Sequence, residues 1–383
     1  MLIPLPLKKA AAAPAGWVRP SDWPAMPASV ANEIDILAAV YDNGSNYCAV
    51  NVTVSSGTYT VDWGDGTAPR TYTSAATANY QYSYSASGLG ALTAEGYKTA
   101  IVKITPTTGG ANITALNLNV RNSAISVAAA SPWLDLQITA ASLTSLIVSG
   151  STGKSELLQR SAALAIGAVT SLSYCFSSCY ALQSVTWPAG SLSAVTDLSS
   201  CFSYCYALQS VTWPSPPAPA TVTFTNGSAL IGWTAHGLKA GMAVVFSTTG
   251  SLPTNFTAGT IYYVIATGLT ANVFEVSATN GGGAITAGSA GSGTQSCARV
   301  PLGAVTAVSS LFASCPSLAR IDNCALWVTF TVASCNLSGT NLDAIYTALP
   351  TTSGKMITVT GNVGTATDTP SIATGKGWSV TGS

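Results

Sequence analysis

LSYCFSSCYALQSVTWP at residues 172–188 is followed by LSSCFSYCYALQSVTWP at residues 198–214, a near-copy displaced by about 26 residues along the chain. A third copy, SSLFASCPSLARI, begins at Ser309, and aligning Phe312 with Phe202 gives an offset of about 110 residues. About 84 residues are therefore inserted between the second and third copies. A period of about 26 residues is typical of a solenoid, in which each copy forms one coil stacked on the next.

The aligned apolar positions predict the interior of these coils. The predicted core positions carry aromatic and thiol side chains: Phe176, Phe202, Phe312, Cys179, Cys205 and Cys315. Cys175 and Cys201 align with Leu311, and a position that accepts leucine is apolar. Buried free thiols are therefore the favoured interpretation. Disulfides, or a zinc site built from the two CxxxC pairs, are the alternatives.

The copies resemble the BspA-type leucine-rich repeats of bacterial surface proteins. AVTDLSSCFSYCYALQSVTWP, residues 194–214, carries the family pattern, and the likeness covers about residues 165–214 and 303–330. ITALNLNV, LDLQI and LTSLIVS, between residues 113 and 149, are degenerate copies. The resemblance implies a solenoid used for adhesion or assembly, with no catalytic residues to transfer.

A separate β-rich module is predicted for residues 31–110. TYTVDWGDGT at residues 58–67 places a turn after a strand, and Tyr-rich YQYSYS follows. This combination resembles a PKD-type β-sandwich, which implies a binding or spacer module. Asp62 and Asp65 are interpreted as turn residues. The alternative is a calcium site or a carboxylate pair, but the further oxygen ligands of a calcium loop are missing.

The insertion is predicted to be an autonomous β domain over residues 214–298. It starts with the proline-rich PSPPAPA and ends with the glycine-rich NGGGAITAGSAGSGTQ, and both compositions are typical of linkers. The string between them resembles a small β module of tailed-bacteriophage structural and fibre proteins. It holds His236, the one histidine of the chain, so a site built on several histidines is excluded.

Residues 1–30 are predicted to form a docking arm. Lys8 and Lys9 follow the short apolar stretch MLIPLPL instead of preceding it, which disfavours a secretory signal, the alternative interpretation. RPSDWPAMP at residues 19–27 is similar to segments of phage virion proteins.

Residues 299–383 are predicted to continue the solenoid and to cap it. Ser338 is expected to cap a helix that stops before Pro350, and the strand MITVT follows. A second short helix is expected within residues 370–375, with Trp378 in a last strand. This tail also resembles the ends of phage virion proteins.

The charge of the chain narrows its function. It has 383 residues, 14 Lys and Arg against 14 Asp and Glu, and only 7% charged residues. A nucleic-acid-binding surface needs clustered cations, and a membrane span needs about 18 unbroken apolar residues; the sequence provides neither. Phosphate-binding and nucleophile-elbow motifs are also missing from it. We expect a non-enzymatic protein without a cofactor or metal.

Aromatic residues that recur at the repeat period are the candidate contact residues: Tyr180, Tyr206, Trp187 and Trp213. Each pair is expected to stack on neighbouring coils. An exposed pair could stack on host sugar rings or on a virion subunit, whereas the structural alternative is packing on the solenoid's own flank. The third copy has Pro316 and Asn323 at these positions, so the stack is expected to span two coils.

The sequence thus predicts a mainly β chain, with a PKD-like β-sandwich followed by a leucine-rich-repeat solenoid over residues 111–213 that holds an inserted small β domain. The expected function is a structural or adhesive protein of a tailed-phage virion, exposed as a fibre, spike or decoration. The expected partners are other virion proteins, a host-surface glycan or protein, and further copies of the chain. The alternatives are a secreted bacterial adhesin and a polysaccharide-degrading tailspike.

Overall fold

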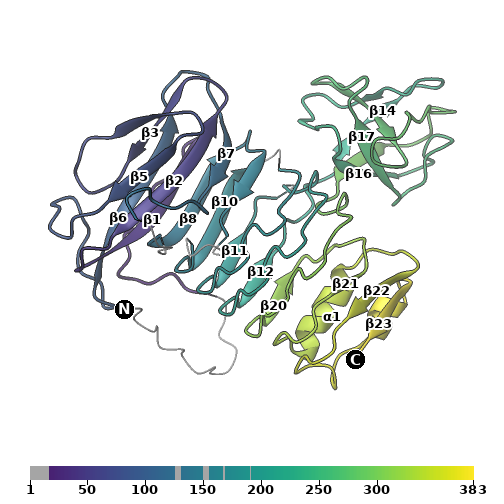
Figure 1. Cartoon of the computed structure of the whole chain (residues 1–383). Coiled ribbons are helices and arrows are strands. Elements are labelled where there is room, and N and C mark those ends of the chain that lie inside the picture. The colour runs from purple at the N-terminus through teal and green to yellow at the C-terminus, as the bar shows by residue number, and fades with distance from the viewer. Residues whose placement is uncertain (1–16, 126–130, 150–154, 167–168, 190) are drawn as a thin grey trace.

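The computed structural model describes residues 17–125, 131–149, 155–166, 169–189 and 191–383. Across these residues the chain is mainly β, with two short helices (Figure 1). Successive strands of the middle of the chain stack in parallel as a β-solenoid. The predicted mainly β class and the solenoid are confirmed at this level.

The largest sheet has nine strands. Its strands are β1 (Glu33–Tyr41), β3 (Thr58–Asp62), β4 (Arg70–Thr73), β6 (Tyr97–Pro106), β8 (Trp133–Ala140), β10 (Arg160–Ile166), β11 (Ser184–Thr186), β12 (Ser210–Thr212) and β20 (Arg320–Asp322). Their order is β20-β12-β11-β10-β8-β1-β6-β3-β4. Pairing is antiparallel from β4 to β8 and parallel from β8 to β20, where Figure 1 shows the strands side by side.

The register of the parallel strands follows the sequence repeat. Val185 in β11 lies opposite Val211 in β12, which lies opposite Ile321 in β20. All three side chains are buried. The same position therefore faces the core in each coil, although equivalent residues of the first two strands are 26 residues apart and those of the second two are 110 apart. The intervening segment leaves this register undisturbed.

A second sheet covers the first half of the core. It contains β2 (Tyr47–Val54), β5 (Thr77–Gln81), β7 (Ile113–Asn117) and β9 (Ser145–Ile147), in the order β5-β2-β7-β9. Alternate residues of β1 and β2 enter one hydrophobic cluster that continues through the coils as far as Trp378. The predicted boundary between residues 110 and 111 is wrong as a structural break, because β1 pairs with β8 and β2 pairs with β7 across it.

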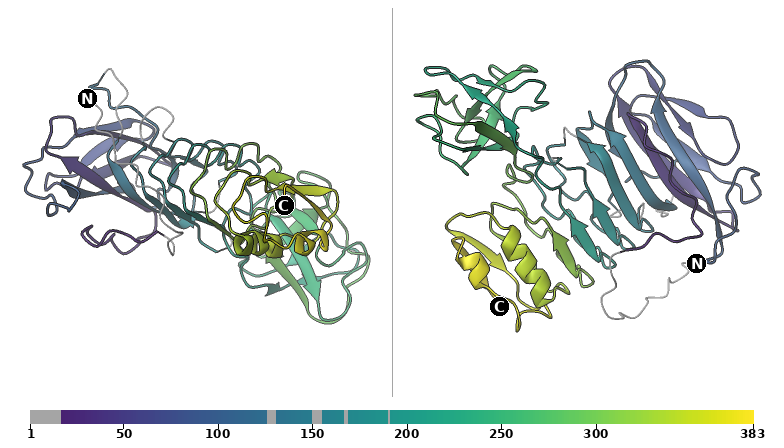
Figure 2. Two further views of the ribbon diagram at one scale, coloured as in Figure 1. Left: turned by 90° about the horizontal axis from the view of Figure 1, so that it is seen from below. Right: turned by 180° about the vertical axis from the view of Figure 1, so that it is seen from behind.

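The segment between β12 and β20 forms a sheet of its own. Its strands are β13 (Ala220–Thr221), β14 (Thr223–Phe224), β15 (Ile231–Gly232), β16 (Ala243–Thr248), β17 (Ile261–Ile265), β18 (Val273–Ser277) and β19 (Gln295–Arg299). Their order is β13-β19-β16-β17-β18-β15-β14, around a cluster that includes Phe246 and Phe274. Figure 2 shows this sheet beside the coils, and the Ala243 N–H donates to the Ser193 carbonyl of a coil at 3.1 Å.

The C-terminal region combines two helices with a parallel sheet. Its elements are β21 (Phe330–Thr331), α1 (Gly339–Ala348), β22 (Lys355–Thr358), α2 (Ser371–Thr374) and β23 (Trp378–Thr381). Ser338 caps α1 by accepting a hydrogen bond from the Asn341 N–H, and the helix ends before Pro350. The sequence predicts these residues as the start and stop signals of the helix, so the predicted order of helices and strands is confirmed.

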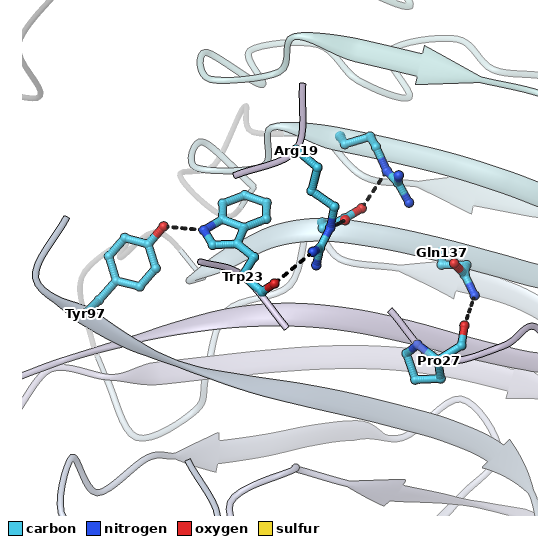
Figure 3. A network of polar contacts seen from close by, with 7 residues as sticks. Arg19, Trp23, Pro27, Tyr97 and Gln137 are labelled. Carbon is cyan, nitrogen blue, oxygen red and sulfur yellow. Dashed lines mark hydrogen bonds and ion pairs between the residues drawn. The ribbon is translucent and has the colours of Figure 1, made fainter. Parts of the chain in front are cut away.

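Residues 17–30 form a strap, here called the N-terminal strap, that lies along the outer face of the nine-stranded sheet (Figure 3). The Trp23 indole N–H donates to the Tyr97 hydroxyl at 2.8 Å, and the Gln137 amide donates to the Pro27 carbonyl at 3.1 Å. Residues 17–30 therefore pack on the fold and do not extend from it as a free arm, whereas docking of this segment on a partner stays a prediction. Residues 1–16 lie outside the described residues.

Buried carboxylates lie beneath the N-terminal strap. Asp135 in β8 is fully buried and forms ion pairs of 2.9 Å with Arg19 of the strap and with Arg160 in β10. Asp35 in β1 is 2% exposed. Burial, together with neighbouring Glu33, raises the pKa of Asp35 from 3.8 to about 6.

Candidate contact surface

In each coil a run of consecutive turns precedes the strand. The backbone of these turns is hydrogen-bonded both to the next coil and within its own coil. The Phe176 N–H donates to the Cys201 carbonyl of the next coil at 2.9 Å, and the Phe202 N–H donates to the Leu311 carbonyl at 3.0 Å. The Cys179 N–H closes a turn on the Phe176 carbonyl within its own coil at 3.1 Å. Because each coil is bonded to its neighbour, these turns form a continuous surface and are not free loops.

Phenylalanine side chains stack inside the coils. The Phe176 and Phe202 rings lie 5.5 Å apart with an 8° angle between their planes, and the Phe202 and Phe312 rings lie 5.7 Å apart with an angle of 4°. All three rings are buried, so the predicted core position is an aromatic stack through three coils. The stack continues across the insertion without a break.

The cysteine position adds a hydrogen bond between coils. The Cys205 thiol donates to the Phe176 carbonyl at 3.1 Å, and the Cys315 thiol donates to the Phe202 carbonyl at 3.0 Å. Burial raises the pKa of Cys205 well above its ordinary value and the pKa of Cys315 to about 12. The thiols therefore stay protonated near neutral pH and keep their donor hydrogen.

The recurring tryptophans lie inside the molecule. Trp187 is 8% exposed and Trp213 is 1% exposed, and each indole packs edge-on against the phenylalanine ring of its own coil. The hypothesis that they are surface contact residues is therefore wrong. The repeat period alone could not show which recurring pair, the tryptophans or the tyrosines, is buried. A side chain can recur at this period on the inner or the outer face of a coil.

The recurring tyrosines lie outside. Tyr180 is 42% exposed and Tyr206 is 45% exposed, and their rings stack at 5.4 Å with an angle of 19°. Tyr204, which is 49% exposed, meets Tyr206 edge-on at 6.3 Å. We call Tyr180, Tyr204 and Tyr206 the tyrosine cluster. The expected stack of two rings on neighbouring coils is present, and a third ring extends it.

Tyr204 was not predicted, because it does not recur. It takes a left-handed backbone conformation with a φ of 61°, and the aligned residues Ser178 and Ser314 have φ values of 60° and 59°. A second such position holds Tyr174, which is 60% exposed with a φ of 55°. This conformation costs an L-residue about 1–2 kcal/mol, so a bulky tyrosine is an unusual occupant. The available signal was a tyrosine where the other copies have serine.

The other predicted sites hold structural residues. Asp62 accepts a hydrogen bond from the Gly64 N–H at 2.9 Å, and Asp65 accepts bonds from Thr67 and from the Tyr80 hydroxyl. Burial acts to raise the pKa of Asp65, but these hydrogen bonds outweigh it and the pKa lies below its ordinary value. His236 is buried, and its Nδ1 accepts from the Leu238 N–H at 2.9 Å. The described residues contain no group of three or more potential metal ligands.

Comparison of the chain with family models, with curated proteins and with solved structures finds no match. Neither helix of the described region has the length and apolar character required to cross a bilayer. The tyrosine cluster is therefore interpreted from its own chemistry. It consists of exposed aromatic rings on a hydrogen-bonded backbone, and Asp197 is the one charged residue in the sequence between Ser161 and Trp213.

Proposed function

We propose that the chain is a non-enzymatic structural or adhesive protein of a tailed-phage virion, displayed as a fibre, spike or decoration. In this proposal the tyrosine cluster contacts a host surface or a neighbouring virion protein. The single observation that carries the contact role is the set of three adjoining tyrosine rings, each between 42% and 49% exposed, on coils whose backbones are hydrogen-bonded to one another. Tyrosine is enriched at binding interfaces because it supplies a large contact area at low conformational cost.

Other features support this assignment. The sequence resemblance of residues 31–110 to a PKD-type sandwich, of the coil segments to leucine-rich repeats and of residues 214–298 to a phage β module would together give a modular particle protein. Stacked coils would hold the tyrosine rings at fixed spacing without paying ordering entropy on binding. The scarcity of charge favours contact through aromatic and hydroxyl groups.

The proposed presence of the chain in the virion is tested by mass spectrometry of gradient-purified phage particles. Peptides of this chain should sediment with the particles in constant ratio to the other structural proteins. Recovery only in the soluble fraction of the lysate overturns the virion assignment, and it leaves the contact role of the tyrosine cluster to be judged separately.

The contact role is tested with the double variant Tyr180→Ala/Tyr206→Ala in the full chain. Binding to host envelope, or to purified particles lacking the chain, should weaken at least tenfold, because loss of two adjacent aromatic anchors removes about 2 kcal/mol or more. Met356→Ala removes an apolar side chain of similar exposure, 38%, from β22 and is the matched control. Equal binding by the double variant and this control overturns the role.

A further inference from the structure

A pocket of about 320 Å³ lies where the ends of β2 and β5 meet the chain that follows β7, away from the tyrosine cluster. Most of its lining residues carry a polar group, and one of them carries a guanidinium. The lining residues are Tyr47, Arg70, Asn79, Tyr80, Gln81, Asn122, Ser123 and Ala124. The volume is at the lower end of the range for small-ligand sites, which suits a single sugar-sized unit.

Arg70 is exposed, and its guanidinium packs on a stack of aromatic rings. Trp63 is fully buried, and its ring lies 4.6 Å from the Tyr80 ring with an angle of 8° between the planes. The Arg70 guanidinium lies over the Tyr80 ring, 4.7 Å from its centroid. The Tyr80 hydroxyl donates to buried Asp65, which prevents the ring from turning. The guanidinium therefore rests on a fixed platform, an arrangement that reduces the entropy it loses when it binds a ligand.

Several polar groups of the pocket lining have no hydrogen-bond partner among the described residues. Within the described part of the chain, the Arg70 guanidinium forms no hydrogen bond or ion pair, and the Tyr47 and Ser123 hydroxyls form no hydrogen bond. Gln81 donates its amide to the Gly44 carbonyl, which leaves its own side-chain oxygen available. Asn122 differs, because both ends of its amide are bonded to backbone groups.

The Asp65 carboxylate does not occupy the guanidinium. Its oxygens accept from the Thr67 N–H, from the Thr67 hydroxyl and from the Tyr80 hydroxyl, and among the described residues it forms no ion pair with Arg70. The planar edge of Arg70 thus keeps its N–H donors for a group arriving from solvent. A carboxylate matches that edge in a bidentate geometry.

We propose that this pocket binds the carboxylate-bearing sugar unit of an acidic polysaccharide. Arg70 would pair with the sugar carboxylate, and Tyr47, Gln81 and Ser123 would exchange hydrogen bonds with ring hydroxyls. An acidic peptide fits less well, because its carboxylate would use Arg70 and leave the hydroxyls and the amide oxygen unmatched. The proposal does not depend on the tyrosine cluster or on a virion location.

The test is calorimetric titration of the full chain with short oligosaccharides of galacturonate, glucuronate and sialate. At least one of them should bind, and its methyl ester, which keeps the ring and loses the charge, should bind at least tenfold more weakly. Arg70→Gln should weaken binding at least tenfold, and Arg70→Lys should fall between this variant and the parent chain because it keeps the charge and loses the planar fork. Lys239→Gln removes one exposed positive charge elsewhere and should change nothing.

Three results would overturn the proposal. The first is that every acidic saccharide fails to bind while circular dichroism shows an intact fold. The second is that the Arg70 and Lys239 variants lose binding equally, which identifies general charge attraction. The third is that a glutamate-rich peptide binds as tightly as the best saccharide and responds equally to Arg70→Gln, which identifies an acidic-peptide site.

Discussion

The coil interior and the face beneath the N-terminal strap bury polar groups in opposite ways. The coils hold uncharged donors, the thiols of Cys205 and Cys315, which bond to backbone carbonyls of the preceding coil. The strap-covered face holds carboxylates, Asp135 between two arginines and Asp35 with a raised pKa. The first region is built from repeated positions, whereas the second joins segments that are far apart in the chain.

The difference follows from stacking. A charge at a repeated interior position would lie about 5 Å from its own copy in the next coil, and like charges at that distance repel. Cysteine can repeat because its donor is neutral and its acceptor is a carbonyl one coil away. Beneath the strap nothing repeats, so the two carboxylates can differ: Asp135 pairs with two arginines, whereas one oxygen of Asp35 is buried without a hydrogen-bond partner among the described residues. We therefore expect the stability of the coils to be independent of pH and that of the strap-covered face to depend on it.

The largest expected effect is in the coil interior. Phe202→Ala removes the middle ring of the phenylalanine stack and should lower the free energy of unfolding by about 3–5 kcal/mol, because it leaves a cavity between two coils. The loss, measured by denaturant titration, should be the same at pH 5 and pH 8. Tyr206→Ala in the same coil truncates an exposed ring and should cost about 1 kcal/mol or less. Equal losses for the two variants would contradict the distinction between interior and exterior rings.

The second effect concerns Asp35. Its folded-state pKa of about 6 lies above the unfolded value of 3.8, so the folded state binds the proton more tightly and loses stability as pH rises between these values. Asp35→Asn should match the parent chain near pH 4 and exceed its unfolding free energy by about 3 kcal/mol at pH 8. Glu33 and Lys103, the other charged groups that act on Asp35, remain in place. A pH-independent difference between the two proteins would show that burial of this charge is not the cause.

The smallest effect separates two buried thiols of the same coil. Cys201 and Cys205 are both fully buried, but Cys201 aligns with Leu311 whereas cysteine occupies the Cys205 position in all three copies. Cys205→Ala should cost about 1 kcal/mol more than Cys201→Ala, because it removes the only bond that a thiol donates to the Phe176 carbonyl among the described residues, whereas the Phe176 N–H that contacts the Cys201 sulfur keeps its bond to the Cys201 carbonyl. Paired denaturation curves test this. A larger loss of unfolding free energy for Cys201→Ala than for Cys205→Ala would show that the Cys205 thiol contributes through packing alone.

Much of the coil region could be predicted because its sequence repeats. Three aligned copies reveal which positions face inward, and a residue exchange such as Cys201 for Leu311 identifies the position as apolar. The helix over Gly339–Ala348 was predictable for a different reason, since capping by Ser338 and the stop before Pro350 are local signals.

Features that depend on contacts between distant segments were not predictable. Nothing near Asp135 in the sequence indicates Arg19, which is 116 residues away, so the sequence alone favours a free arm over a strap. The stacking of Arg70 on Tyr80 was not predictable for a different reason: the two residues are close in sequence, but β4 and β5 belong to different sheets, and the sequence does not show how those sheets pack. The exposure of Tyr180 and the burial of Trp187 depend on which side of the coil each faces, and a single period does not record that.

The antiparallel pairing of β13 with β19 has a consequence for the order of folding. Equivalent residues of β11 and β12 are 26 residues apart, whereas those of β12 and β20 are 110 apart. Closing the longer loop costs about 1 kcal/mol more in chain entropy. When Ala220 pairs with Cys297, the two ends of the intervening segment are brought together and most of that loop is already closed. The coil that contains β20 should therefore dock on β12 fastest after the seven-stranded sheet has formed. Folding of that sheet would thus set the rate at which this part of the solenoid is completed.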